Sequence, residues 1–322
     1  MGLGSGAYRS RFGEQLKMDY AQFQALSRED VAQLVRDAGP VTGVFALNGT
    51  RRWFQLEYGH EGQAVGQAYF EAITDRLIEL TALLFDYGVH TLLVPLLSPH
   101  LFTSRGQEYT SRTIGALTYL TRTPKFLDFY RQYHIAARFY GDYAGYLVDI
   151  GQSALLAEIN TFNEAHLDEV RHRLYWGVCA HDSVTTTARL AVELYAATGQ
   201  IPSNEEMIRT YYGADIPPVS FFIGASKPRA FDTPLLLTGR EDLYFTVAPS
   251  PYLNELQLRD ILYDHLFARR KAHSKYHEMT AADWDALRSF YEQNARQTLG
   301  VGMRVHEWGL WQPTNQLEFD RR

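Results

Sequence analysis

The residues best suited to do chemistry lie where a short apolar run stops. Val41–Leu47 is apolar and ends in Asn48-Gly49, a pattern typical of a buried strand that closes on a turn. Arg51 and Arg52 follow at once. Glycine lets the backbone approach an anion closely, and arginine can donate paired hydrogen bonds to phosphate oxygens. The segment therefore predicts a cradle for a phosphate or diphosphate group; the alternative is an exposed turn with a solvated arginine pair.

The amino-acid sequence of this cradle resembles a known signature. The stretch from Asn48 to Trp53 reads Asn-Gly-Thr-Arg-Arg-Trp, which resembles the Asp-Gly-Asn-x-Arg-Trp signature of the cis-prenyltransferase superfamily. It is more similar to the Asp-Gly-Thr-Arg-Arg-Trp-Phe of the tuberculosinol synthase type of diterpene synthase, which has the same fold. The resemblance implies that Asn48 and Arg51 act in catalysis. It implies that the diphosphate is bound by Gly49, Thr50, Arg52 and Trp53.

One residue departs from the signature, and this difference affects the expected binding of the metal ion. Asn48 stands where these families have an aspartate that handles the diphosphate and its magnesium. An amide can coordinate Mg²⁺ weakly or donate to a phosphate oxygen, so we expect Mg²⁺ as the cofactor, with a dependence weakened by Asn48. The resemblance assigns a magnesium ligand to Asp242, because Asp242–Thr246 resembles a Glu-Leu-Tyr-Phe-Thr block whose acidic residue binds the metal. The alternative for Asp242 is a solvated carboxylate at the end of a helix or a strand.

The resemblance implies roles for three residues that follow the cradle. Gly59-His60 stands where the family has a Gly-His pair at the start of the next helix, so His60 is expected to donate to the phosphate. Two tyrosines at the reaction centre of the tuberculosinol synthase type correspond to Tyr69 and Tyr109. The alternative for Tyr69 is a structural place at the start of the apolar stripe of its helix. A chance match is the alternative for both tyrosines, because the chain has 21 of them.

Elongation of a prenyl chain is not expected from this sequence. Elongating cis-prenyltransferases hold isopentenyl diphosphate with an Arg-x-Gly-Gly-Glu-x-Arg-x-Ser stretch, which falls on Ile223–Phe231. Arg229 matches and is expected to bind diphosphate, but Ile223 and Phe231 replace an arginine and the serine. A second diphosphate would lose its main clamp. The expected acceptors therefore carry no phosphate: water, an alcohol or a nucleoside.

The resemblance, together with these residues, implies an enzyme of terpene metabolism. It would ionise an allylic C15–C20 prenyl or cyclic diterpenyl diphosphate, release pyrophosphate, and quench the carbocation with water, by proton loss or with a small acceptor. Cations and N–H donors stabilise the leaving diphosphate, and an aromatic, water-poor wall stabilises the carbocation. An upstream diterpene cyclase would supply a cyclic substrate. Two alternatives stay open: a chain-elongating cis-prenyltransferase, and a non-catalytic subunit of a heteromeric one.

The elements that must position these residues alternate between strands and helices. Short apolar runs separated by helical patterns imply βαβ units and a mainly parallel sheet. We therefore predict an α/β fold with a central sheet of about six strands flanked by helices, and the resemblance implies that this fold is of the cis-prenyltransferase type. A loosely ordered extension over residues 1–20 would precede a single catalytic domain over residues 21–322. The apolar runs are Val41–Leu47, Val89–Leu97, Ile135–Tyr140, Leu174–Ala180, Val219–Ile223 and Leu243–Val247.

The composition excludes several other classes of protein. A net charge of -6 argues against a partner made of nucleic acid. No run reaches the roughly 18 apolar residues of a membrane span, so no integral membrane segment is expected. Cys179 is the only cysteine and cannot form an internal disulfide, which suits a reducing compartment. We expect a cytoplasmic protein, and the resemblance implies a homodimer because the family dimerises.

Overall fold

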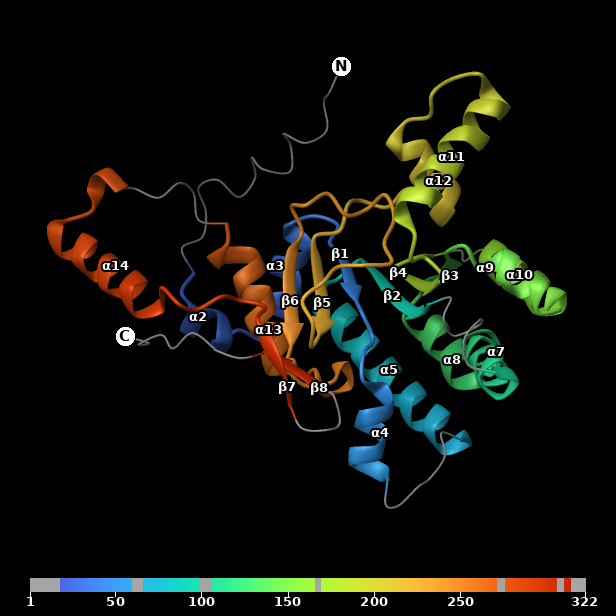
Figure 1. Cartoon of the computed structure of the whole chain (residues 1–322), viewed down its shortest axis with the longest axis horizontal. Coiled ribbons are helices and arrows are strands. Elements are labelled where there is room, and N and C mark those ends of the chain that lie inside the picture. The colour runs from blue at the N-terminus through green and yellow to red at the C-terminus, as the bar shows by residue number, and fades with distance from the viewer. Residues whose placement is uncertain are drawn as a thin grey trace.

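Six parallel strands form one central sheet in the computed structural model, which describes residues 18–59, 66–98, 106–165, 169–270, 276–305 and 310–313 (Figure 1). The strands pair in the order β3-β4-β2-β1-β5-β6, and every pair is parallel. Each predicted apolar run overlaps one strand, so the predicted α/β fold is confirmed. The strands are β1 (Thr42–Phe45), β2 (Thr91–Leu97), β3 (Ile135–Tyr140), β4 (His172–Val178), β5 (Phe221–Ala225) and β6 (Asp242–Thr246).

Two hydrophobic cores lie on the two faces of the sheet. Successive residues of a strand point to opposite faces, and here Phe45 and Phe221 enter one core whereas Val44 and Phe222 enter the other. The larger core packs the sheet against α3 (Arg28–Asp37), α5 (Gln67–Asp86), α7 (Gly106–Arg122), α8 (Pro124–Gln132), α10 (Ser153–Glu164) and α13 (Glu255–Tyr263). The smaller core packs it against α12 (Asn204–Tyr212) and the loop after β5. Strands buried on both faces read as continuous apolar runs. For this reason the sequence pattern located them.

The helices between the strands follow the predicted alternation. Helix α5 carries the predicted apolar stripe, with Leu77, Leu80 and Leu84 buried. The helical elements are α2 (Tyr20–Ala25), α3 (Arg28–Asp37), α4 (Thr50–Tyr58), α5 (Gln67–Asp86), α7 (Gly106–Arg122), α8 (Pro124–Gln132), α9 (Tyr143–Asp149), α10 (Ser153–Glu164), α11 (Ser183–Thr198), α12 (Asn204–Tyr212), η1 (Ser250–Tyr252), α13 (Glu255–Tyr263), η2 (Asp264–Ala268), η3 (Tyr276–Glu278) and α14 (Ala281–Asn294).

The C-terminal part of the chain adds two elements outside the sheet. An antiparallel hairpin of β7 (Gly302–Val305) and β8 (Leu310–Pro313) lies near the carboxyl ends of β5 and β6, and α14 stands away from the sheet (Figure 1). Helix α14 buries none of its residues. Within the described ranges, no helix is both long enough and apolar enough to cross a bilayer.

Candidate active site

A cavity of about 850 Å³ opens at the carboxyl ends of β1, β2 and β5. Strand β1 pairs with β2 on one side and with β5 on the other. The order of strands therefore reverses at β1. Ligands of parallel α/β sheets bind at such a switch point, because the loops that leave the neighbouring strands diverge there. The topology alone makes this cavity the leading candidate for a functional site.

The cradle segment forms the polar mouth of the cavity. Gly49 precedes α4 with a φ of 77°, and a Cβ atom placed on it would lie 2.9 Å from Pro249 Cβ. Glycine alone suits both this conformation and this space. Because α4 starts at Thr50, the backbone N–H groups of its first turn, up to Arg52, point out of the helix end. Outward N–H groups and the helix dipole make this end a favourable site for an anion.

Ser250 fastens the loop between β1 and α4. Its Oγ accepts a hydrogen bond from Asn48 N–H at 2.9 Å and donates one to the Ala46 carbonyl at 2.9 Å, and Ser250 itself is 1% exposed. Its N–H also donates to the Asn48 carbonyl at 2.9 Å. Across the mouth, Asn48 Nδ2 donates to the Ala225 carbonyl at 3.1 Å. These bonds join the ends of β1 and β5 and leave Asn48 Oδ1 as a neutral acceptor at the cavity.

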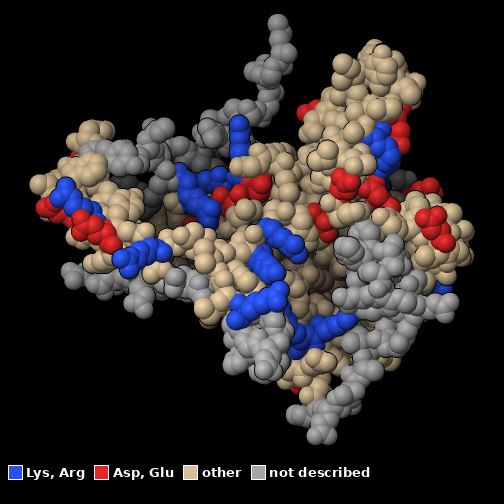
Figure 2. Space-filling model, in the orientation of Figure 1, with Lys and Arg blue, Asp and Glu red and all other residues tan. Residues whose placement is uncertain are grey.

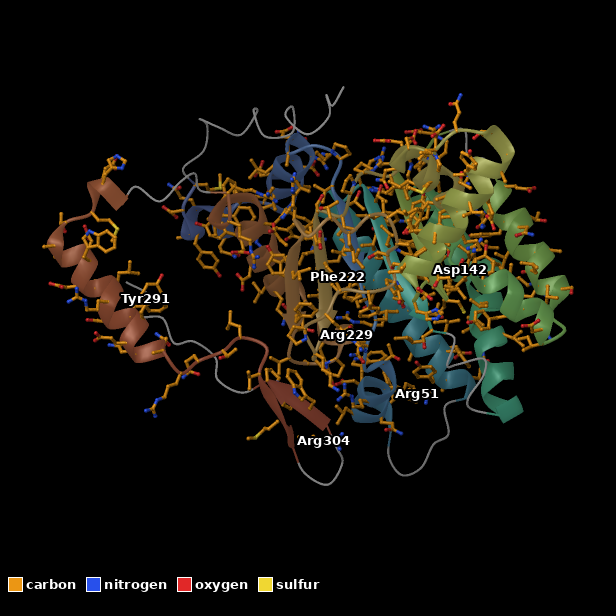
Figure 3. The ribbon with its side chains drawn as sticks, turned by 45° about the horizontal axis from the view of Figure 1, so that its top comes forward. Arg51, Asp142, Phe222, Arg229, Tyr291 and Arg304 are labelled. Atoms are coloured by element: carbon orange, nitrogen blue, oxygen red, sulfur yellow. The ribbon has the colours of Figure 1, made fainter. Side chains whose placement is uncertain are left out.

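Basic side chains surround the mouth. Arg51 and Arg52 come from α4, and Lys227 and Arg229 come from the loop after β5. Figure 3 places Arg51 and Arg229 at the same end of the sheet, and Figure 2 shows Lys and Arg side chains gathered around a hollowed part of this face. Asp232 is the one carboxylate among the described residues that line the cavity. The mouth is therefore electropositive and suits a ligand with several negative charges.

Behind the mouth, the wall of the cavity is apolar and aromatic. Tyr69 stands between the two regions: its hydroxyl lies 2.8 Å from Thr50 Oγ1, and its ring packs edge-on against Phe70 with 5.5 Å between centroids. An apolar wall favours a hydrocarbon chain, and aromatic rings stabilise a cation. The remaining wall is formed by Ile73, Leu77, Ala116, Leu117, Tyr119, Leu120, Phe126, Phe231, Phe245 and Trp311.

Comparisons with known proteins decide the family. The chain is 34% identical over 294 residues to tuberculosinyl adenosine transferase of Mycobacterium tuberculosis, covering 90% of this chain and 96% of that protein. The chain belongs to the cis-prenyltransferase-like diterpene synthases. It is also 26% identical over 282 residues to (+)-kolavelool synthase of Herpetosiphon aurantiacus, covering 87% of this chain and 91% of that one. No family model matches. The chain is thus an enzyme of the terpene synthase and prenyltransferase type.

A solved structure agrees with this assignment at the level of the fold. Lavandulyl diphosphate synthase from Lavandula x intermedia, determined in complex with dimethylallyl diphosphate, matches with a TM-score of 0.54 and 17% identity. The match covers 74% of this chain and 98% of that one. The sheet and its flanking helices are therefore those of a cis-prenyltransferase-like fold.

In this diterpene synthase, most of the predicted site residues lie together. The cavity is lined by the cradle residues up to Arg52, by Tyr69 and by Arg229. Trp53 is different: it is 5% exposed, packs edge-on against Tyr58 at 5.6 Å and does not line the cavity. The structure therefore does not place Trp53 where it could touch a diphosphate in the cavity.

Two predicted residues fall outside what the structure describes. His60 lies in the undescribed segment 60–65. Tyr109 lies in α7, whose later turns line the cavity, but its side chain is not among those described. The roles of both residues remain predictions.

Asp242 lies at the other end of the sheet from the cradle. It begins β6 and pairs with Phe221, the first residue of β5, whereas Ala225 at the end of β5 lines the cavity. Burial raises the pKa of Asp242, but the hydrogen bond from His265 and the charge of Arg270 outweigh it and lower the pKa overall. The distance from His265 Nδ1 to the carboxylate is 2.6 Å. Within one chain, Asp242 and Asn48 therefore do not form a common metal site.

The donors at the mouth do not fit a magnesium site built by this chain alone. Among the described residues, no group of three or more His, Cys, Asp or Glu side chains could hold a metal ion. Asn48 offers one neutral oxygen. Mg²⁺ is usually held by one or two carboxylates together with the phosphates of the substrate. A metal at this mouth would therefore depend mainly on the diphosphate for its ligands.

Several residues of the site were not identified from the sequence. Lys227 had a usable signal, because it stands two residues before Arg229 just after a buried strand. Asp232 directly follows the Ile223–Phe231 stretch that was compared with the elongating signature, but nothing there assigns it a role. Ser250 and Trp311 had no local signal, since each reaches the cavity or its loop through the tertiary fold.

Proposed function

We propose that this enzyme ionises an allylic C15–C20 prenyl diphosphate, or a cyclic diterpenyl diphosphate, in the cavity at the end of β1. The carbon–oxygen bond breaks, its electron pair leaves with the pyrophosphate, and the carbocation is quenched by water, by proton loss or by a small acceptor. One observation carries the proposal: a basic mouth at a helix N-terminus and an apolar, aromatic wall belong to the same cavity.

The mouth would hold and stabilise the leaving diphosphate. The N–H groups at the start of α4 offer hydrogen bonds that are fixed before the reaction begins. Arg51 and Arg52 would add charge from α4, and Arg229 would add it from the opposite loop. Arginine pairs with phosphate oxygens through two parallel hydrogen bonds. Such preorganised donors stabilise the charge that develops as the bond breaks.

The wall would take the isoprenoid chain and then the carbocation. Tyr69 is placed at the boundary by Thr50, so its hydroxyl could direct a water molecule at the cation. One relative is named as a transferase to adenosine and another as a synthase of kolavelool, so the two names imply different products. We include adenosine and water among the acceptors to be tested.

Chain elongation is not part of the proposal. Ile223 is fully buried in β5, where the elongating signature has an arginine. Phe231 takes the place of the serine and lies under the guanidinium of Arg229, with 5.4 Å from Cζ to the ring centroid. A second diphosphate would find one arginine and an apolar ring there. A phosphate-free acceptor suits this surface better.

Three further features belong to the proposal. Enzymes that act on prenyl diphosphates generally use Mg²⁺, and we propose a weaker dependence here, because Asn48 supplies a neutral oxygen. We also propose a homodimer with α14 in its interface, since no residue of α14 is buried within one chain. A cyclic substrate would come from a reaction that cyclises a linear diterpenyl diphosphate without ionising the allylic end.

The experiment is mass spectrometry of the products formed from geranyl, farnesyl, geranylgeranyl and bicyclic diterpenyl diphosphates. Each substrate is offered with and without Mg²⁺ and adenosine, and pyrophosphate release is followed in parallel. Failure of all four substrates to yield pyrophosphate would contradict the proposal.

Arg51→Ala tests the mouth directly. We expect the rate of pyrophosphate release to fall at least about 100-fold, because the leaving group loses a charged donor. The matched control is Arg131→Ala on α8, an exposed arginine paired with Asp128 away from the cavity, which should keep the rate. Equal rates in the two variants would show that Arg51 does not stabilise the leaving group.

A further inference from the structure

Asp232 is an exception in its surroundings. It lies on the loop after β5 and lines the same cavity as Arg51, Lys227 and Arg229. Among the described lining residues it is the one with a carboxylate. A negative charge at this place repels a diphosphate, so binding of the leaving group does not explain Asp232. Its charge suits a cation or a group that gives up a proton.

The backbone of Asp232 is held firmly while its carboxylate is not. Tyr140 donates from its hydroxyl to the Asp232 carbonyl at 2.8 Å, and Tyr212 donates in the same way to Pro234 at 2.7 Å. The φ of Asp232 is 57°, in the left-handed region that residues other than glycine rarely adopt. Within the described part of the chain, no hydrogen bond or ion pair reaches the carboxylate of Asp232. The fold thus fixes the backbone of Asp232 and leaves its half-buried carboxylate available to a ligand in the cavity.

Burial makes this carboxylate more basic than usual. Loss of solvent raises the pKa of Asp232, against the opposing charges of His181 and Arg229. An aspartate with a raised pKa is a better proton acceptor, and enzymes tune carboxylates in this way for acid–base work. The titratable and charged groups that interact electrostatically with Asp232 come from four places: Arg229 on its own loop, Cys179 and His181 after β4, Tyr140 on β3 and Tyr211 on α12.

We propose that Asp232 is the base that accepts the proton released when the carbocation is quenched. This rests on the function proposed above. When water or a hydroxyl attacks the cation, a carbon–oxygen bond forms, and the proton of the resulting oxonium group passes to the Asp232 carboxylate. When the cation is quenched by elimination, a carbon–hydrogen bond breaks, its electron pair forms the double bond, and the proton goes to the same oxygen. The protonated Asp232 then returns its proton to solvent after the product leaves.

This role explains why an unpaired carboxylate is kept among basic residues. The cations hold the leaving diphosphate at the mouth, and Asp232 offers a separate proton acceptor that does not bind it. A buried carboxylate without a partner destabilises the fold when it is ionised. The sign follows from the raised pKa: the penalty is absent at low pH, where Asp232 is protonated in both the folded and the unfolded state, grows as the pH rises above the ordinary pKa of aspartate, and is complete above the raised pKa. Asp232 is therefore a residue that lowers stability at neutral pH and serves the reaction.

Asp232→Asn is the test, because asparagine tolerates the same backbone and cannot accept the proton. We expect product formation to fall about 100-fold or more, with the affinity for inorganic pyrophosphate unchanged or tighter. The wild-type rate should fall as the pH drops through the pKa of Asp232, and the variant should lose this dependence. The melting temperature of the variant at pH 7 should equal or exceed that of the wild type. Asp232→Gly, which also accommodates this backbone, serves if the asparagine variant does not fold.

The matched control is Asp142→Asn at the neighbouring end of β3. Asp142 is bound by Arg189 and by Thr186 at 2.5 Å and does not line the cavity, so this variant should lose stability and keep its rate. A wild-type rate and pH profile in Asp232→Asn would overturn the proposal. A lost rate that excess Mg²⁺ restores would overturn it too, in favour of a metal ligand. If the wild-type enzyme itself releases no pyrophosphate from any substrate, the proposed function fails first and this inference with it.

Discussion

Ser250→Ala removes a single hydroxyl, and the structure allows its cost to be worked out. The change takes away the partner of two backbone groups, Asn48 N–H and the Ala46 carbonyl, each of which lies 2.9 Å from Ser250 Oγ. A buried polar group without a partner costs about 1–3 kcal/mol. Because Asn48 is exposed at the mouth, water can replace part of the loss. We therefore expect the free energy of unfolding to fall by about 2–3 kcal/mol.

The same substitution should weaken anion binding, although Ser250 itself is not expected to contact the anion. The two bonds of Ser250 Oγ hold the loop that leads into Gly49 and the first turn of α4. Without them the loop samples other conformations, and the affinity falls in proportion to the fraction that can still bind. If that fraction drops to about one tenth, the Kd for pyrophosphate rises about tenfold.

The assay pairs urea unfolding with calorimetric titration of pyrophosphate, and Ser203→Ala is the control. Ser203 Oγ accepts a hydrogen bond from Glu206 N–H at 3.2 Å at the start of α12, away from the cavity. Loss of this cap should cost about 1 kcal/mol of stability and leave the Kd for pyrophosphate unchanged. A Ser250→Ala protein that is destabilised but binds pyrophosphate like the wild type would refute the idea that Ser250 organises the cradle.

The sheet and the cradle could be predicted because each depends on neighbours in the chain. Parallel strands buried on both faces appear as apolar runs, so β1 and β2 were visible as Val41–Leu47 and Val89–Leu97. The cradle is contiguous from Asn48 to Arg52, and one turn followed by one helix end places all of it. Arg229 lies on the loop just after β5, so the end of that strand is enough to bring it near the cradle.

Trp53 and Asp242 show what a contiguous motif leaves open. Trp53 follows Arg52 in the chain, but the turn of α4 directs it into the core rather than toward the mouth. Asp242 was assigned from the resemblance of Asp242–Thr246 to a family block, which does not say at which end of a strand a residue lies. The pairing of Asp242 with Phe221 fixes it at the beginning of β6. The positions of the two side chains thus depend on the phase of α4 and on the register of β6, which the motif sequences do not determine.

Ser250 and Asp232 could not have been found from local sequence at all. Ser250 contacts Asn48 across 202 positions of the chain, and no pattern of spacing marks such a pair. Asp232 stands between Phe231 and Thr233, where no motif marks a carboxylate with a role. Its importance depends on three facts of the tertiary structure: the cavity it lines, the basic residues around it, and the absence of a partner among the described residues.

Two further predictions concern Asn48 and α14. Asn48→Asp loses the bond to the Ala225 carbonyl, which costs about 1 kcal/mol, whereas a charge at the N-terminus of α4 returns about 0.3–1 kcal/mol. Stability should therefore change little, while the new carboxylate should lower the Mg²⁺ concentration needed for half-maximal pyrophosphate release; an unchanged titration would count against a metal beside this residue. The second prediction is a dimer that depends on α14. Its side chains Trp284 and Tyr291 are 44% and 61% exposed, and they lie seven positions apart, which places them on the same face of the helix. Replacing both by aspartate should convert a dimer into a folded monomer in sedimentation equilibrium, because the charges cannot be buried in an apolar interface. A monomeric wild-type protein would contradict the proposed dimer. A dimer that persists in the doubly substituted protein would show that its interface does not depend on α14.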